Sequence, residues 1–293
     1  MHRIDTPTAQ KDKFGAGKNG FTRGNPQTGT PATALDDDYF DMLQEELAGV
    51  VEAAGITLDK SKHNQLLHAL SGRLINVQSF TASGTYTPSV GTKFVIVEVL
   101  GGGGGGGSNA ATPSSGAAAG AGGSSGAYGI CKHTPTGPVS VVVGAGGAGG
   151  IATPSGADGS SGGATSYDTV TAPGGSGGPR GIAVNVFPTG GGVSSGSLGV
   201  TGSVIVSSPG TCGQYGILYS NSNGTGGSGG NSIYGAGGIS RTINASGAGT
   251  SQGANGAGYG SGGGGAVSVN TSTAVSSRGG NGSPGVVIIW EYA

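Results

Sequence analysis

The residues that could carry out catalysis are sparse in the long C-terminal part of the chain. After residue 80 the carboxylates are Glu98, Asp158, Asp168 and Glu291, and the one histidine is His133. Glycan hydrolysis needs two acids held about 5–9 Å apart. Glu98 and Glu291 lie within strand patterns and are expected on an exposed or interfacial face. Asp158 and Asp168 could meet in space, but nothing around them favours it. Since no nucleophile motif accompanies His133, we predict no catalytic residues and no enzyme.

The same region carries side chains better suited to binding. Tyrosine and arginine provide large contacts for a modest loss of entropy. In loop-like settings between glycine tracts, the candidate receptor-contact residues are Tyr128, His133, Arg180, Phe187, Tyr215, Tyr219, Tyr234, Arg241 and Tyr259. The alternative, that several of these tyrosines pack in a core, remains open. Core packing is favoured for the aromatics beside strand patterns, namely Tyr86, Phe94, Tyr167, Trp290 and Tyr292.

Three other patterns predict no site. Residues 15–20, GAGKNG, match the dinucleotide pattern G-x-G-x-x-G, but they follow no strand and open no βαβ unit. His63 and His68 are five apart, which does not place them on one helix face, so no metal site is expected. Cys131 and Cys212 form neither a metal site nor a disulfide framework, and they fit small buried or surface thiols. We expect no cofactor.

Composition divides the chain near residue 80. The first 80 residues hold 18 of the 27 Lys, Arg, Asp and Glu residues but 8 of the 69 glycines. The net charge of −1 gives no electrostatic footprint for nucleic acid. No stretch reaches the roughly 20 apolar residues of a membrane span, and the N-terminus lacks the apolar core of a secretory signal. We therefore expect the protein to be made and kept in a cytoplasm until another structure carries it out of the cell.

The sequence of the N-terminal part predicts a turn-rich segment over residues 1–35 and a helical hairpin over residues 36–75. Negative charge at Asp36–Asp38 favours a helix start, an apolar stripe follows at helical spacing, and Gly55 is a typical helix end. A second helix is predicted over 59–74. Two short helices bury little apolar surface, so this part needs self-association or docking on a larger assembly.

Residues 76–293 predict strands joined by glycine tracts. The blocks 94–100, 139–143 and 286–292 are rich in β-branched residues, which favours strands. Glycine recurs every third residue, for example at 120, 123, 126 and 129. A period of three is that of the extended left-handed helix. The predicted fold class is mainly β with polyglycine-II-like extended helices, a β-sandwich braced by a glycine-rich helix bundle, after a short N-terminal α-helical hairpin.

Two resemblances extend this interpretation. The stretches MHRIDTPTAQKDKFGAGKNGFTRGNPQTGTPAT, LDDDYFDMLQEELAGVVEAAG and LDKSKHNQLLHAL resemble the N-terminal segment of enterobacterial phage and prophage tail-fibre proteins. The order of SGTYTPSVGTKFVIVEVLGGGGGGG, VSVVVGAGGAGG, GADGSSGGATSY and GGNGSPGVVIIWEY resembles a glycine-rich domain of phage tail fibres. This family implies attachment to the phage baseplate or tail through residues 1–75, a fibre-like homotrimer, and a possible tail-fibre assembly chaperone.

The favoured hypothesis is a tail-fibre adhesin of the virion tail, assembled in the host cytoplasm. Its receptor would be a bacterial outer-membrane protein or lipopolysaccharide, contacted by residues 76–293. The longest stretches without the glycine period, about 182–220 and 231–259, are predicted to be apical loops. The alternatives are a purely structural fibre with its receptor-binding tip on another chain and, with less support, a glycan depolymerase.

Overall fold

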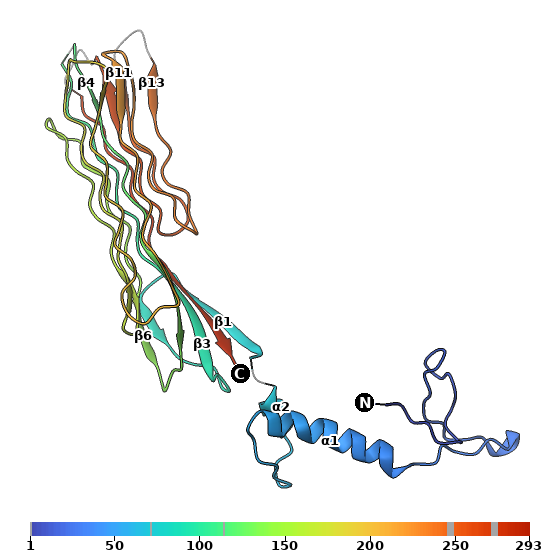
Figure 1. Cartoon of the computed structure of the whole chain (residues 1–293). Helices are drawn as coiled ribbons and strands as arrows, with labels where there is room; N and C mark the ends of the chain where they lie inside the picture. Colours follow the sequence, from blue (N-terminus) through green and yellow to red (C-terminus); the bar gives the residue numbers. More distant parts are fainter. Residues whose placement is uncertain (1, 71, 114, 245–248, 271–274) are drawn as a thin grey trace. The chain divides into compact units, whose positions relative to one another are not determined.

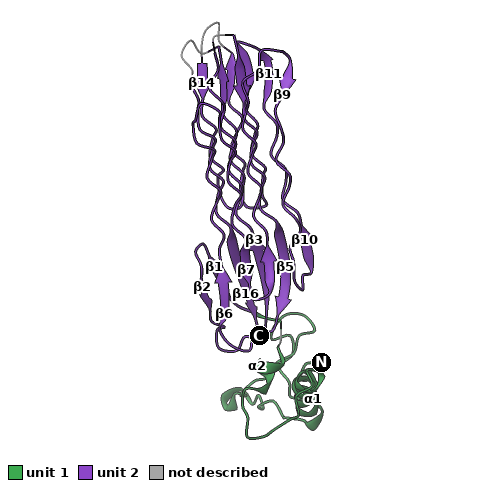
Figure 2. Ribbon diagram, turned by 90° about the vertical axis from the view of Figure 1, so that its left-hand side faces the viewer, with its two compact units in different colours: residues 1–73, 293 green, residues 74–292 purple. Residues whose placement is uncertain are grey.

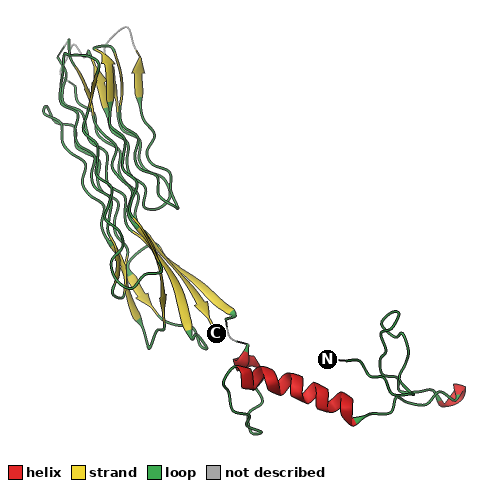
Figure 3. Cartoon of the chain, viewed as in Figure 1, coloured by secondary structure: helices red, strands yellow, loops and turns green. Residues whose placement is uncertain are grey.

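A computed structural model describes residues 2–70, 72–113, 115–244, 249–270 and 275–293. The chain divides into two compact units, residues 1–73 with Ala293, and residues 74–292 (Figure 2). Most of the second unit is neither helix nor strand, although its segments lie side by side (Figure 3). The strands make the protein mainly β, with few helices.

The first unit contains three helical elements, the 3-10 helix Pro26–Thr28, α1 (Asp37–Ala53) and α2 (Gln65–Ala69). Helix α1 begins as predicted, because the Asp36 carboxylate accepts a hydrogen bond from the Tyr39 N–H at 2.9 Å. It ends before Gly55, which has a φ of +73°. Val51 is the buried residue of α1, while Phe40, Leu47 and Val50 stay exposed.

The second helix is much shorter than the predicted 59–74. The side chain of Asp59 accepts hydrogen bonds from the N–H and hydroxyl of Ser61, and Gln65 Oε1 accepts from the Asp59 N–H. These contacts form a turn over residues 59–64, and short polar side chains compete with helix in this way. At the other end Leu74 already belongs to a strand.

Sixteen strands form four antiparallel sheets within the described residues. Their bounds are β1 Leu74–Phe80, β2 Gly84–Tyr86, β3 Phe94–Leu100, β4 Ala117–Ala119, β5 Tyr128–His133, β6 Val139–Val142, β7 Thr165–Tyr167, β8 Val170–Ala172, β9 Thr189–Gly190, β10 Val206–Ser208, β11 Ile217–Ser220, β12 Asn223–Thr225, β13 Thr242–Asn244, β14 Gly249–Ser251, β15 Val267–Val269 and β16 Val286–Tyr292. The strands predicted at 94–100, 139–143 and 286–292 are confirmed as β3, β6 and β16.

Two of the sheets form a sandwich at the end of the second unit where the chain enters it, which we call the proximal sandwich. One sheet has the order β1-β16-β3-β5-β10 and the other β2-β6-β7-β8. Alternate residues of β3 face inward, so Val95, Val97 and Val99 are fully buried. They pack with Tyr86 and Tyr167, which confirms the core positions predicted for these two tyrosines.

The other two sheets form a smaller distal sandwich at the opposite end of this unit (Figure 1). Their orders are β13-β12-β11-β9 and β14-β15-β4. The core between them contains Leu218, Ile243, Val267 and Val269, with the predicted contact residue Phe187 packed against it.

Glycine tracts connect the two sandwiches and hydrogen-bond to one another. In the buried tract 101–109, the N–H of every third residue donates to the same neighbouring segment. The three sets of donors reach segments 121–127, 157–163 and 277–283, over distances of 2.8–3.3 Å. Each turn of three residues therefore points its donors in three directions, which agrees with the period of three in the sequence.

The carbonyls of the same tract accept hydrogen bonds from three further segments, within 147–150, 175–181 and 263–266. A side chain would not fit between these backbones. A Cβ added at Gly103 would overlap the carbonyl of Ser261, and one at Gly105 would overlap that of Ala148. Glycine is required here because it lets backbones approach to hydrogen-bonding distance.

Two sequence predictions need correction. Glu291 was expected on an exposed or interfacial face but is fully buried, because its side of β16 faces the loop that carries Ser89. The stretches 182–220 and 231–259 are not simply apical loops. Within them, β10 pairs with β5 in the proximal sandwich, and long parts run alongside the glycine tracts (Figure 1). Residues 245–248 lie outside the described residues.

Candidate functional site

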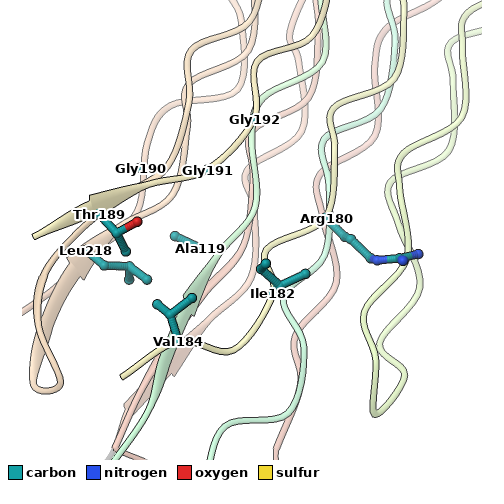
Figure 4. A pocket seen from close by; sticks show the side chains of 9 residues that line it. All are labelled: Ala119, Arg180, Ile182, Val184, Thr189, Gly190, Gly191, Gly192 and Leu218. Atoms are coloured by element: carbon teal, nitrogen blue, oxygen red, sulfur yellow. The ribbon is translucent and has the colours of Figure 1, made fainter. Parts of the chain in front are cut away.

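A pocket of about 200 Å³ opens in the distal sandwich, where the edges of its two sheets meet (Figure 4). On one side is β9, the edge strand of its sheet. On the other is the segment around Val184, which pairs with Ala117 of β4. The lining residues are Ala119, Arg180, Ile182, Val184, Thr189, Gly190, Gly191, Gly192 and Leu218. The pocket is a short slot between two strand edges, lined by aliphatic side chains together with polar groups and glycine backbone.

The backbone beside this slot is partly unpaired. Gly191 donates to the Gly216 carbonyl across the ladder of β9 and β11. In an antiparallel pair the hydrogen bonds alternate between residues, so the N–H and C=O of Gly190 point away from β11. The slot therefore offers apolar side chains together with backbone groups, which is the combination that binds an extended segment.

Arg180 lies at the mouth of the slot. Its backbone N–H donates to Asp158 Oδ1 at 2.9 Å, and its guanidinium points away from the apolar lining (Figure 4). Over the described residues this guanidinium makes no ion pair. It can therefore attract a negative group on a partner without first breaking an internal contact.

Of the residues predicted to contact a receptor, the distal sandwich gathers five. Tyr215 and Tyr219 are about half exposed, at 50% and 53%. Arg180 and Arg241 are also exposed, whereas Phe187 is partly buried on the core. Of these, only Arg180 lines the pocket. The distal sandwich thus exposes two tyrosines and two arginines, which fit a binding surface, although Arg241 lies beside β13 at the sheet edge opposite the pocket.

A second group, Tyr128, Tyr234 and Tyr259, lies where the glycine tracts meet the proximal sandwich. Glu98 Oε2 accepts hydrogen bonds from the hydroxyls of Tyr128, at 2.8 Å, and Tyr234. Glu98 Oε1 accepts from Trp290 Nε1 at 3.0 Å. Burial, followed by the hydrogen bond to Glu98, raises the pKa of Tyr234 to about 12. Tyr259 joins the group through its backbone N–H, which donates to the Tyr234 carbonyl at 3.1 Å.

The remaining predicted residue, His133, lies in the proximal sandwich at the end of β5. Its Nδ1 is 2.9 Å from the hydroxyl of Tyr167, whose pKa is raised by burial and by nearby Cys131 and Asp168. This is an internal contact in a part of the unit remote from the distal pocket.

The arrangement supports binding better than catalysis. Asp158 contacts the backbone of Arg180, whereas Asp168 lies in the turn between β7 and β8 of the proximal sandwich, so the two carboxylates do not form a pair. Where residues are described, no group of three metal-ligating side chains occurs. Both cysteines are free, and burial raises the pKa of Cys131 to about 11.

The sequence prediction missed most of the pocket lining, including Ile182, Val184 and Leu218. One signal could have identified part of it. Apolar residues alternate at Ile182, Val184 and Val186, which is a strand-like pattern within a glycine-rich region. The contribution of Leu218 depends on how β11 pairs, which the sequence does not reveal.

Comparison with known proteins assigns the glycine-rich part of the chain to a family. The signature of a family described as a glycine-rich domain matches residues 79–292, and the chain belongs to this family. A segment of 76 residues, 26% of the chain, is 78% identical to the uncharacterized protein StfP of Escherichia coli strain K12. The match spans about a third of that relative, 36% of its length. Over the described residues, no helix has the length and apolarity to cross a membrane.

Proposed function

We propose that this chain is a tail-fibre adhesin of a bacteriophage or prophage. Its first unit would attach to the virion tail or baseplate, and the distal sandwich of its second unit would contact the bacterial surface. The observation that carries this proposal is the distal pocket, which Arg180 lines, in a sandwich that also exposes Tyr215 and Tyr219.

The glycine tracts would serve as the rigid support for this surface. We infer that they are polyglycine-II helices, because their hydrogen-bond donors point in three directions with a period of three residues. Binding residues are commonly carried by loops on a rigid scaffold. In this arrangement the distal turns can vary while the glycines that touch backbone stay fixed.

The first unit has the features of a docking module. Helix α1 keeps Phe40, Leu47 and Val50 exposed along one side, and its described contacts leave this apolar side uncovered. A tail protein or further copies of the chain, as in the homotrimer expected of a fibre, would cover it. An assembly chaperone could shield the same surface before the virion forms.

Binding of the labelled full-length chain to host bacteria tests the adhesin proposal. Tyr219→Ala and Arg180→Glu should each weaken binding by about tenfold or more, the effect of a residue near the centre of an interface. Val142→Ala is the control, since Val142 is similarly exposed but lies in β6 of the proximal sandwich. If the distal variants bind like the wild type, the distal sandwich is not the receptor-contact surface.

The same assay separates the receptor classes and the alternative function. Protease-treated cells should lose binding if the receptor is an outer-membrane protein, and cells with truncated lipopolysaccharide should lose it if the receptor is a glycan. A chain that binds neither untreated cells nor isolated lipopolysaccharide would be a structural fibre whose receptor-binding tip belongs to another protein.

Attachment is tested separately with Leu47→Lys, which places a charge on the exposed side of α1. Virions assembled with this variant should carry less of the chain, whereas the free variant should still bind cells. Unchanged incorporation would show that this side of α1 does not dock.

A further inference from the structure

A groove lies on the side of the second unit, between the proximal sandwich and the glycine tracts that leave it. It consists of two adjoining pockets of about 450 and 350 Å³, whose walls share Thr211 and Asn231. Pockets that bind ligands commonly enclose about 300–1,000 Å³. We call the two pockets together the lateral groove, and none of its lining residues belongs to the distal pocket.

The lining of the lateral groove is polar in part but carries no charge. No Asp, Glu, Lys, Arg or His lines either pocket. Hydroxyl and amide groups come from Ser125, Ser208, Thr211, Gln214, Ser228 and Asn231. Such groups offer both donors and acceptors. They match a neutral ligand that is rich in hydroxyl groups, whereas a phosphate or carboxylate would find no cation here.

Several of these polar groups are free to bind. Asn231 Oδ1 accepts from the Gly237 N–H at 2.7 Å, which fixes the amide and leaves its Nδ2 without a partner among the described residues. Thr211 is held by its backbone N–H, which donates to Ser125 Oγ at 2.8 Å. The Thr211 hydroxyl and the exposed Gln214 amide have no hydrogen bond where the chain is described. The middle of the groove therefore presents oriented donors and acceptors.

An aromatic ring forms the wall at the proximal end of the groove. The Tyr128 hydroxyl donates to Glu98 Oε2 at 2.8 Å, and the ring of Tyr234 lies edge-on to it at 6.2 Å between centroids. Tyr128 is thus held in place before a ligand arrives, which lowers the entropy cost of binding. The face of an aromatic ring is negative, so it attracts the weakly positive C–H groups of a ligand.

These features together define the ligand class. A sugar ring has an apolar C–H face and a rim of hydroxyl groups, which match the Tyr128 ring and the uncharged polar lining. An extended peptide would instead pair with free backbone groups of a strand edge. In this groove the N–H groups of Gly229 and Gly230 already donate to Gly238 and Gly123 within the lattice, so side chains supply the free groups.

We propose that the lateral groove binds a neutral oligosaccharide. The proposal does not rest on contact between the distal sandwich and a receptor, because the two sites share no residue. It is tested with purified full-length chain and purified polysaccharides, so its failure would leave the cell-binding experiments on the distal variants unaffected.

The first measurement identifies a probe. The labelled chain is applied to an array of bacterial polysaccharides, in which neutral polymers of hexoses and N-acetylhexosamines are compared with acidic polymers that contain uronic acids or phosphate. Saturable binding to at least one neutral polymer is expected, and the acidic polymers should not compete with it.

The second measurement places the bound polymer, with Cys212 as a native reporter. Cys212 is free and exposed and lines the groove, whereas Cys131 is buried. Iodoacetamide should therefore alkylate Cys212 first. With the neutral polymer at ten times its dissociation constant, alkylation of Cys212 should slow by about tenfold, because only about a tenth of the grooves are empty. An acidic polymer should not change the rate.

Two variants test the polar lining. Thr211→Val removes a hydroxyl group and keeps the shape of the side chain, and Gln214→Ala removes an amide. Each should weaken binding of the neutral polymer by about tenfold, the effect of losing one hydrogen bond to the ligand. Thr136→Val is the matched control, since Thr136 is also exposed but lies outside the groove. All three variants should melt like the wild type, because none of these side chains has a described hydrogen bond.

Three results would overturn the proposal. One is the failure of every neutral polymer on the array to bind. Another is binding that leaves the alkylation rate of Cys212 unchanged, which would place the polymer elsewhere on the chain. The third is equal affinity of Thr211→Val, Gln214→Ala and the wild type for the neutral polymer.

Discussion

Replacing Gly104 by alanine tests the backbone lattice, because glycine has no side chain whose lost contacts could account for a change in stability. Gly104 donates to Ser124 and accepts from Gly263. An added Cβ would overlap the carbonyl oxygen of Ser176, far inside the 3.0 Å that real Cβ contacts essentially never violate. That carbonyl already accepts from the Ser124 N–H at 2.9 Å. The methyl group must therefore displace a neighbouring tract and weaken a buried hydrogen bond.

The expected cost follows from these contacts. Overpacking costs about 1–3 kcal/mol, and a buried polar group that loses its partner costs about 1–3 kcal/mol more. The smaller entropy of the unfolded alanine chain offsets about 0.4–1 kcal/mol. The net destabilisation is about 2–5 kcal/mol. For a unit of this size it should lower the melting temperature by roughly 5–20 °C.

Gly137→Ala is the matched control for this substitution. A Cβ there meets no heavy atom within 4 Å, and its φ lies outside the left-handed range. This variant should be unchanged or more stable by about 0.4–1 kcal/mol, through the unfolded state alone. Thermal unfolding followed by circular dichroism measures both variants. Equal melting temperatures for Gly104→Ala and the wild type would refute the close-packed lattice.

Two further predictions concern single side chains. Asp36→Ala removes the cap of α1 and should destabilise the first unit by about 1 kcal/mol in chemical denaturation, whereas Asp36→Asn should retain most of it. Burial alone would raise the pKa of Glu291, but hydrogen bonds from Ser89 and Gln78 outweigh it and lower the pKa below its ordinary value of 4.5. The ionised carboxylate thus stabilises the fold above that pH, and the contribution is lost as the pH falls through the folded pKa. Unfolding measured from pH 6 to pH 2 should depend less on pH in Glu291→Gln, and an unchanged profile would contradict this assignment.

The strands were predictable because their side chains carry the information. The β-branched blocks at 94–100 and 286–292 became the central strands β3 and β16, which pair along their full length. The glycine period likewise indicated segments with a repeat of three residues, and the hydrogen bonds of the tract 101–109 follow that repeat. Which tract lies beside which was not predictable, since glycine has no side chain and every tract offers the same backbone groups.

The candidate site was predictable only in part, for the same reason. Arg180, Tyr215 and Tyr219 stand out in a glycine-rich sequence with few charges, and all three lie at the distal sandwich. Tyr128 and Tyr234 have the same appearance in sequence, yet both donate to Glu98, which is more than one hundred residues away from Tyr234. Contacts between segments so distant in sequence depend on the order of the tracts, and so does the pairing that brings Leu218 into the pocket.

Successive N–H groups of a tract point in three directions in turn. The register of each tract against its neighbours therefore depends on the number of residues in it. One residue inserted into 101–109 would turn every later N–H by a third of a rotation, toward a neighbour whose carbonyls stand at a different height. An insertion of three residues would restore the directions but would shift the tract against all its neighbours together. Length can therefore change in the turns beyond the lattice and hardly at all within it. A family of such proteins should accumulate insertions at the distal turns while the tracts between them keep a constant length.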